Sequence, residues 1–288
     1  MAILRERSEK RIQEKPALTD ENYEKVLDRF GFGSRPDPTL DNLNKLYKAW
    51  CRGVGYDNIL KRVYYARKET GPFPVMEPND FVTTWLKHGT SGSCWPTAEA
   101  LFNILLKSGY EVERVSSEML NCGDPMRPNH GTCFVHIDGE IYLADTGVVA
   151  EEVLQLIDGK ETRTTSKAFG IMSKGDGHVW WRPSHSNQDV EIAMIDGDCS
   201  NEYFAHRYEK TKEFSLFNHS LYVRKNKNDG IVTYGRGNII RVNPEGEMSV
   251  TPTDLKDLPA LLIEEMGLSE EIVSQTPMQD EEGARFDP

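Results

Sequence analysis

A cysteine at the expected start of an amphipathic helix is the first candidate for chemistry. Cys94 lies in the segment HGTSGSCWPTAEALFNILLKSGY, residues 88–110, behind a run of small residues. Pro96 is typical of the first turn of a helix, and Gly109 of its left-handed end. Unpaired N–H groups and the helix dipole favour an anion at such a start, so one interpretation of Cys94 is a thiolate nucleophile. A buried cysteine that packs as a small hydrophobe is the other interpretation.

Hairpin geometry supplies a base and an acid for this nucleophile. Two β-rich runs in the segment NHGTCFVHIDGEIYLADTG flank Asp138-Gly139, a strong signal for a two-residue hairpin loop. In that register His130 is diagonal to Asp145 on the same face, within reach of long side chains, whereas His136 lies too far along the strand. A cysteine-based triad is therefore one hypothesis. A satisfied histidine near an ordinary turn aspartate is the alternative.

Helices and then strands must position these residues. Residues 1–110 have the apolar spacing of helices, in DENYEKVLDRF, LDNLNKLYKAWC, NDFVTTWLKH and the Cys94 segment. After Gly109, short runs rich in β-branched and aromatic residues predict strands. From Phe214 we expect two or three more strands, and then a closing helix from about Thr253 to Met266. This order is typical of an α+β protein.

Composition and charge narrow the classes of partner. The net charge of −12, from 34 basic and 46 acidic residues, disfavours nucleic acid or an anionic membrane as the main partner. No apolar stretch approaches the ~18–20 residues that span a bilayer, and the N-terminal segment lacks the apolar core of a secretory signal. Five cysteines, without a C-x-x-C pair, argue against a disulfide framework and a zinc knuckle. We therefore predict a cytoplasmic protein without a bound metal.

The ordered candidates resemble the arylamine N-acetyltransferases. That family has a cysteine at a helix N-terminus, a histidine that opens a strand and an aspartate on the next strand. Cys94 in GTSGSCW, His130 and Asp145 match these positions, and the intervals of 36 and 15 residues are similar to those of the family. The segment GYDNILKR resembles the family's Pro-Phe-Glu-Asn stretch, and FSLFNHSLYVRKNKNDGIVTYGRGNIIR resembles its third domain. The resemblance covers roughly residues 40–270.

The resemblance implies three domains and a cysteine-protease-like triad at their first junction. Residues 1–112 would form an N-terminal helical bundle that carries the catalytic cysteine. Residues 113–213 would form a central antiparallel β-barrel that carries the histidine and the aspartate. Residues 214–288 would form a C-terminal α/β lid with an acidic tail.

Further site residues follow from the same resemblance. The beginning of the third domain would lie beside coenzyme A, with Ser215 and Asn218 near the coenzyme and Arg224 facing its phosphates. The oxyanion and acyl pocket would be formed by Trp95, Gly131, Gly147 and Val148. The chain departs from the family in two places: it has TSGS before Cys94 where the family has Arg-Gly-Gly-aromatic, and DTGVV where the family has Asp-Val-Gly-Phe-Gly. These replacements reshape the expected acyl pocket.

The resemblance implies ping-pong transfer of an acyl group, here acetyl, from acetyl-CoA to an amine such as an arylamine or hydrazine. Acetyl-CoA would be a co-substrate, with no tightly bound cofactor. The same triad permits an amide synthase that uses carrier-protein thioesters in natural-product biosynthesis. A cysteine hydrolase, in which water replaces the amine, is a further alternative, as is a binding module that has kept the fold without the chemistry.

Overall fold

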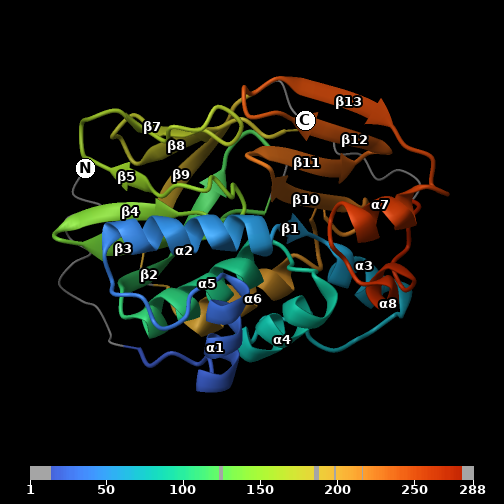
Figure 1. Cartoon of the computed structure of the whole chain (residues 1–288), viewed down its shortest axis with the longest axis horizontal. Coiled ribbons are helices and arrows are strands. Elements are labelled where there is room, and N and C mark those ends of the chain that lie inside the picture. The colour runs from blue at the N-terminus through green and yellow to red at the C-terminus, as the bar shows by residue number, and fades with distance from the viewer. Residues whose placement is uncertain (1–13, 123–125, 185–187, 198, 216, 281–288) are drawn as a thin grey trace.

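A computed structural model describes residues 14–122, 126–184, 188–197, 199–215 and 217–280 (Figure 1). Its helices are α1 (Asp20–Arg29), α2 (Leu40–Gly53), α3 (Ile59–Ala66), α4 (Pro78–His88), α5 (Cys94–Ser108), α6 (Asn201–Lys210), α7 (Leu258–Glu264) and α8 (Glu270–Val273). Of the expected acidic tail, residues 281–288 lie outside the described residues. No helix in the described part of the chain is long and apolar enough to cross a membrane.

The predicted helices before residue 110 are confirmed, and their ends follow local chemistry. Thr19 and Thr39 cap α1 and α2, since each hydroxyl accepts a hydrogen bond from a backbone N–H three residues on. Gly89 and Gly109 end α4 and α5 in the left-handed conformation. Three helices were not predicted: α3, α6 and α8, which are eight, ten and four residues long.

The first sheet is a nearly closed antiparallel barrel. Its strands are β2 (Glu111–Met119), β3 (His130–Ile137), β4 (Glu140–Ala144), β5 (Leu154–Leu156), β6 (Thr162–Arg163), β7 (Ile171–Ser173), β8 (His178–Trp181) and β9 (Val190–Gly197). They are ordered β5-β4-β3-β2-β9-β8-β7-β6. The Thr162 hydroxyl donates to the Gln155 carbonyl at 2.5 Å, which brings the two end strands together. The expected β-barrel is confirmed.

The hairpin between β3 and β4 has the predicted register. Ile137 pairs with Glu140, and Cys133 pairs with Ala144. Asp138 and Gly139 form the loop with φ of 52° and 82°, the left-handed pair that a type I′ turn requires. This loop therefore fixes which residues of the two strands lie opposite each other.

The second sheet joins distant parts of the chain. Its strands are β1 (Tyr56–Asp57), β10 (Tyr222–Lys227), β11 (Gly230–Gly235), β12 (Asn238–Val242) and β13 (Met248–Pro252), in the order β1-β10-β11-β12-β13. Four strands follow Phe214, β10 to β13, so the prediction of two or three was too low. The two-residue β1 was not predicted. The predicted closing helix is also shorter than expected, since α7 begins at Leu258.

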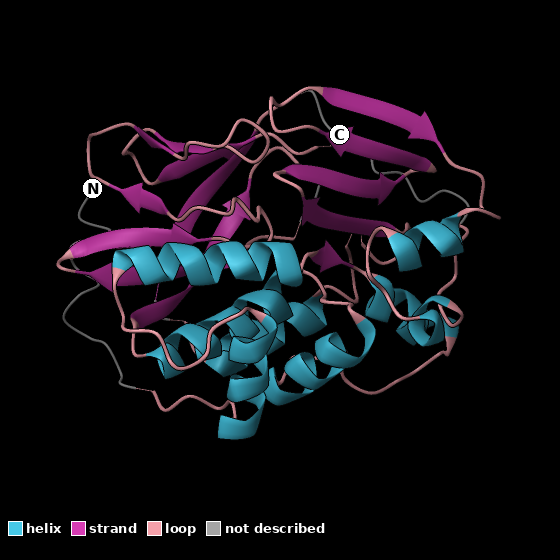
Figure 2. Ribbon diagram, viewed as in Figure 1, coloured by secondary structure: helices cyan, strands magenta, loops and turns pink. Residues whose placement is uncertain are grey.

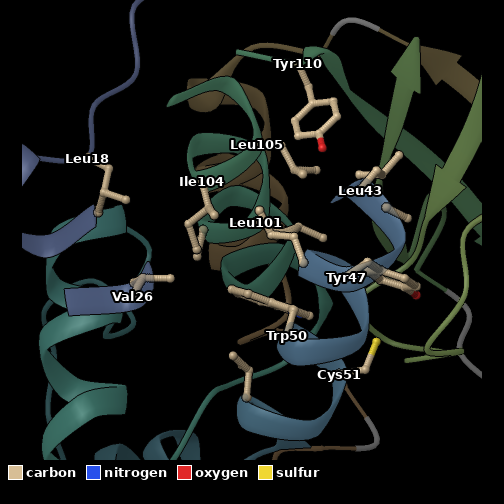
Figure 3. Packing of buried hydrophobic residues seen from close by; sticks show 14 of the residues in the cluster. Leu18, Val26, Leu43, Tyr47, Trp50, Cys51, Leu101, Ile104, Leu105 and Tyr110 are labelled. Atoms are coloured by element: carbon tan, nitrogen blue, oxygen red, sulfur yellow. The ribbon is translucent and has the colours of Figure 1, made fainter. Parts of the chain in front are cut away.

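Helices gather on one side of the two sheets (Figure 2). The core between α2 and α5 is apolar, and its side chains from the two helices face each other (Figure 3). Those that Figure 3 labels on these helices are Leu43, Tyr47, Trp50, Cys51, Leu101, Ile104 and Leu105, all 0 % exposed. This packing gives α5 a fixed position against the barrel.

Candidate active site

Cys94 is the first residue of α5. Ser93 before it is extended and makes no side-chain capping bond, so the start of the helix is held by other contacts. The Cys94 side chain is 6 % exposed, and its Sγ lies 3.8 Å from the Asn129 carbonyl oxygen, directly before β3. The thiol therefore lies where the helix N-terminus meets the barrel.

His130 and Asp145 meet across the β3–β4 hairpin, as the register predicts. Nε2 of His130 and Oδ2 of Asp145 are 2.7 Å apart, and both side chains are buried. The imidazole also interacts with the Cys94 thiol. The structure thus brings together the three residues of the predicted triad, and their catalytic roles stay a prediction.

The acid is held from two further directions. Oδ1 of Asp145 accepts hydrogen bonds from the backbone N–H groups of Gly147 at 2.9 Å and Val148 at 2.8 Å. The Tyr47 hydroxyl, on α2, donates to the Asp145 carbonyl oxygen at 2.6 Å. Both carboxylate oxygens are therefore in use, and the carboxylate has one orientation toward His130.

Electrostatics favour a charged imidazole. Burial opposes the charge on His130, but the Asp145 carboxylate, its hydrogen bond and the nearby Cys94 raise the pKa of His130 to about 10. Burial likewise opposes ionisation of Asp145, yet His130 and the two backbone N–H groups lower the pKa of that carboxyl. At neutral pH the site therefore holds an imidazolium between a carboxylate and the Cys94 sulfur.

This charge state predicts how readily the Cys94 thiol is alkylated. At pH 7 we expect iodoacetamide to alkylate Cys94 at least about tenfold faster in the wild type than in His130→Gln, because the His130 imidazolium, whose pKa is about 10, favours an anion on the adjacent sulfur. Peptide mass spectrometry separates Cys94 from the partly exposed Cys122 and Cys199. Equal rates of Cys94 alkylation in the two proteins would contradict a role of the imidazolium in activating the thiol.

The segment GYDNILKR, which resembles the Pro-Phe-Glu-Asn stretch, holds the loop before Cys94 in place. The Asp57 carboxylate accepts from the hydroxyl of Thr90 at 2.7 Å, and from the N–H and hydroxyl of Ser91 at 2.7 and 2.9 Å. Asn58 donates through Nδ2 to the carbonyls of Phe217 and Ser220, and its Oδ1 accepts from the Tyr222 N–H. Sequence reasoning gave these two residues no role, although the match to the Pro-Phe-Glu-Asn stretch was the signal.

The predicted pocket residues are close to the triad, in packing roles. A Cβ on Gly147 would lie 2.8 Å from Cε1 of His130, so the absence of a side chain there makes room for the imidazole. A Cβ on Gly131 would lie 2.7 Å from the Trp95 ring, which is itself buried against Phe204. Val148 is buried in the barrel core. Roles of these residues at an oxyanion or acyl pocket stay predictions.

The residues predicted to meet the coenzyme are all buried. The Ser215 hydroxyl accepts from the Phe217 N–H at 3.2 Å, and Asn218 donates to the Thr211 carbonyl at 2.7 Å. Arg224 was predicted to face the phosphates of the coenzyme. It is instead 1 % exposed and lies beside the Trp181 ring. The coenzyme roles of Ser215 and Asn218 stay predictions.

A model of the N-acetyltransferase family matches residues 39–272 of the chain. The chain belongs to this family. The resemblance to the arylamine N-acetyltransferases is thereby confirmed, and the protein is an acyltransferase enzyme, of a family whose chemistry is transfer to an amine through a cysteine. The comparison with curated protein sequences gives no match.

Solved structures share the fold at low sequence identity. An arylamine N-acetyltransferase from Mycobacterium abscessus is 14% identical, with a TM-score of 0.71 over 90% of this chain and 93% of that one. The enzyme from M. tuberculosis is 18% identical, with a TM-score of 0.67 over 90% and 96%. One from Bacillus cereus, described as having a unique Cys-His-Glu catalytic triad, is 15% identical, with a TM-score of 0.65 over 88% and 100%. The acid beside the histidine is an aspartate in the present chain.

The surroundings of Cys94 suit a reaction of a free thiol. Among the residues that the structure describes, no group of three or more His, Cys, Asp or Glu side chains could hold a metal ion. All five cysteines have free thiols. The residues around Cys94 are mostly aromatic, among them Tyr56, Trp95, Phe204 and Tyr222.

Proposed function

We propose that the enzyme transfers an acyl group from a coenzyme A thioester to a small-molecule amine by a ping-pong mechanism. Cys94 is the nucleophile, His130 the general base and acid, and Asp145 the residue that orients His130 and stabilises its charge. The observation that carries the proposal is the buried His130–Asp145 pair, 2.7 Å between Nε2 and Oδ2, beside a cysteine at a helix N-terminus. In domain terms, residues 1–112 supply the nucleophile, 113–213 the base and acid, and 214–288 a lid beside the coenzyme.

In the first half-reaction, the Cys94 thiolate attacks the carbonyl carbon of the thioester. The C–S bond to coenzyme A breaks, and the departing thiolate takes the proton from the His130 imidazolium. Backbone N–H groups at Cys94 and Trp95, in the first turn of α5, have no acceptor within the helix. The Cys94 N–H interacts with the Tyr56 hydroxyl, and we assign the Trp95 N–H to the oxyanion. The products are an S-acyl cysteine, free coenzyme A and a neutral imidazole.

In the second half-reaction, an amine attacks the acyl carbon and the Cys94 sulfur leaves as the thiolate. Neutral His130 takes the proton of the amine nitrogen, which restores the starting ion pair. Part of the rise in the pKa of His130 comes from Cys94. Acylation removes that contribution and so lowers the pKa of His130, which favours transfer of its proton to the departing thiolate.

The free thiols of this chemistry fit a reducing compartment, and we place the reaction in the cytoplasm. Carrier-protein thioesters use the same thiol chemistry as coenzyme A thioesters, and water can replace the amine. The three reactions differ in donor and acceptor, so one experiment separates them.

Intact mass after incubation with acyl-CoA thioesters tests the proposal. We expect the wild type to gain one acyl group, and to lose it again when an arylamine or a hydrazine is added. Cys94→Ala is expected to gain none. Cys133→Ala is the matched control, because Cys133 is also buried next to α5, its thiol donating to the Ala98 carbonyl, and plays no part in the mechanism.

Three outcomes contradict the proposal in different ways. Acylation by a carrier-protein thioester alone would identify the amide synthase. Loss of the acyl group at the same rate with and without an amine would identify the hydrolase. An adduct that persists in Cys94→Ala would place the nucleophile elsewhere.

A further inference from the structure

Arg224 is a buried cation that makes no side-chain hydrogen bond with the part of the chain that the structure describes. Its side chain is 1 % exposed, and Nε, Nη1 and Nη2 have no hydrogen-bond partner among the described residues. A guanidinium remains charged in a protein, and a buried charge without a counter-ion is strongly unfavourable. An arginine kept in such a place therefore points to an anion that binds there.

The pairing of β1 with β10 places Arg224 on the side of the sheet that faces the triad. Arg224 is directly opposite Tyr56 in this antiparallel pair, so their side chains share a face. The Tyr56 hydroxyl interacts with the backbone of Cys94. Two residues further along β10 on the same face, Asn226 donates to the Val149 carbonyl at 2.7 Å, in the loop after Asp145. Arg224 thus has on one side Tyr56, which contacts Cys94, and on the other side Asn226, which contacts the loop after Asp145.

No acceptor among the described residues makes a hydrogen bond with the guanidinium. The Trp181 ring lies 5.5 Å from Cζ of Arg224, and its own Nε1 is buried without a partner among the described residues. Asp145 is near enough to interact with Arg224, but both of its oxygens are bound by His130 and by backbone N–H groups. Glu151, which like Arg224 lies near Cys51, binds Arg52 through Oε2 at 2.8 Å. Its Oε1 and the Oδ1 of Asn226 are buried, but neither makes a hydrogen bond with the guanidinium. A ligand can supply the acceptor that none of these groups supplies.

We propose that Arg224 binds the terminal carboxylate of a short dicarboxylic acyl group attached to Cys94. The preferred donor is then a thioester such as malonyl- or succinyl-CoA. A carboxylate fits the planar fork of a guanidinium with two parallel hydrogen bonds. This inference rests on the proposed function, because the acyl group is held near Arg224 by the thioester bond to Cys94.

The acyl group suits this position better than the amine does. Once it is attached to Cys94 it is the part of either substrate that stays enclosed, whereas the amine must enter and leave. Arg224 is among the largest fully buried side chains, so its ligand must be enclosed as well. The chain length of the thioester that reacts fastest will report the span from Cys94 to Arg224.

Rates of Cys94 acylation by acetyl-, malonyl- and succinyl-CoA test the proposal. We expect a dicarboxylic thioester to react at least about tenfold faster than acetyl-CoA with the wild type. In Arg224→Met this rate should fall by about 100-fold, as for loss of a charge-assisted bidentate pair, while acetyl-CoA changes by less than about threefold. Lys225→Met is the matched control, because it removes the adjacent cation from the opposite face of β10, where Lys225 binds the Gly53 carbonyl, and should leave the preference intact.

A second variant distinguishes loss of the carboxylate contact from misfolding of Arg224→Met. Arg224→Lys keeps the charge and loses the fork, so we expect a dicarboxylic rate between those of the wild type and Arg224→Met. Equal rates for the three thioesters in the wild type would overturn the proposal. An equal loss of all three rates in both Arg224 variants would do the same, since that pattern belongs to a structural role.

Binding of free acids separates this proposal from the proposed function. We expect malonate or succinate, but not acetate or chloride at the same ionic strength, to raise the Tm of Cys94→Ala, and Arg224→Met to abolish the rise. If no coenzyme A thioester acylates Cys94, the proposed donor fails, and this measurement still decides whether Arg224 binds a carboxylate. Absence of an Arg224-dependent rise overturns the carboxylate site. An Arg224 dependence confined to the KM for aminobenzoate, relative to aniline, overturns the assignment to the acyl group.

Discussion

Replacement of Cys94 by serine is expected to lower kcat for acyl transfer by about four orders of magnitude or more, as for loss of the nucleophile in other triad enzymes. A serine hydroxyl does not ionise beside the His130 imidazolium, so the ion pair that supplies the nucleophile is lost. The hydroxyl is smaller than the thiol and fits in the space that the thiol occupies, so the fold should be unaffected. Steady-state kinetics with an acyl-CoA and an arylamine measure the effect, and circular dichroism checks the fold.

Cys133→Ser is the control for this prediction. Cys133 is 0 % exposed and its thiol donates to the Ala98 carbonyl, an interaction that a hydroxyl also makes. We expect its kcat to stay within about threefold of the wild type, because surface and core changes away from the reacting atoms act through stability. Cys94→Ser with more than a tenth of wild-type activity would show that Cys94 does not form the acyl intermediate.

Replacement of Asp145 by asparagine is expected to lower kcat/KM by about 10⁴-fold, with little effect on the fold. Oδ1 of the amide can still accept from the N–H groups of Gly147 and Val148. Its NH₂ group then faces Nε2 of His130 and forces the tautomer that carries its proton on the other ring nitrogen. That nitrogen can no longer take a proton, so the imidazole is held in the wrong state for both half-reactions.

The same variant tests the charge of the imidazole. The pKa of His130, raised to about 10 with the Asp145 carboxylate as the main favourable cause, is expected to fall toward or below its ordinary value when the carboxylate is replaced. A pH titration followed by NMR measures it. Because the pKa of Asp145 is lowered in the folded protein, its stabilising contribution is present above the ordinary carboxyl pKa and is lost as the pH falls through the lowered value. Asp145→Asn should therefore reduce the loss of stability in acid.

A second histidine–carboxylate pair on the same strand gives a matched control. At the other end of β3, Nε2 of His136 lies 2.9 Å from Oε1 of Glu113, which is buried. We expect Glu113→Gln to disturb its histidine in the same way and to leave kcat/KM within about threefold. If Glu113→Gln lowered kcat/KM as much as Asp145→Asn, the loss would be a general effect of breaking a buried pair, and Asp145 would have no special role.

Local chemistry in the sequence was sufficient to predict the His130–Asp145 pair and the helix that begins at Cys94. Two adjacent residues of the right type, Asp138 and Gly139, set the register of the β3–β4 hairpin and with it the pairing of His130 with Asp145. Pro96 and Gly109 similarly set the ends of α5. These predictions depend only on residues close together in the chain, where turn and cap preferences are strong.

What the sequence did not predict depends on contacts between distant segments. β1 has two residues, too few for a periodic pattern, and is a strand only because it pairs with β10, more than 160 residues away. Nothing in the run YVRKNK distinguishes Arg224 from the cations beside it, yet Arg224 is 1 % exposed and lies beside Trp181. The role of Asp57 likewise appears only when Thr90 and Ser91 fold over it.

The two-residue loop at Asp138-Gly139 also limits how this protein can change in length. Side chains alternate between the two faces of a strand, so an insertion of one residue between His130 and Asp145 would turn one of them away from the other. A longer loop at the tip would keep both strands in register only if its added residues stayed outside the ladder. The strand register therefore fixes the interval of 15 residues between His130 and Asp145. In family members with this hairpin, differences in length should be confined to the loop tip or to segments beyond Asp145.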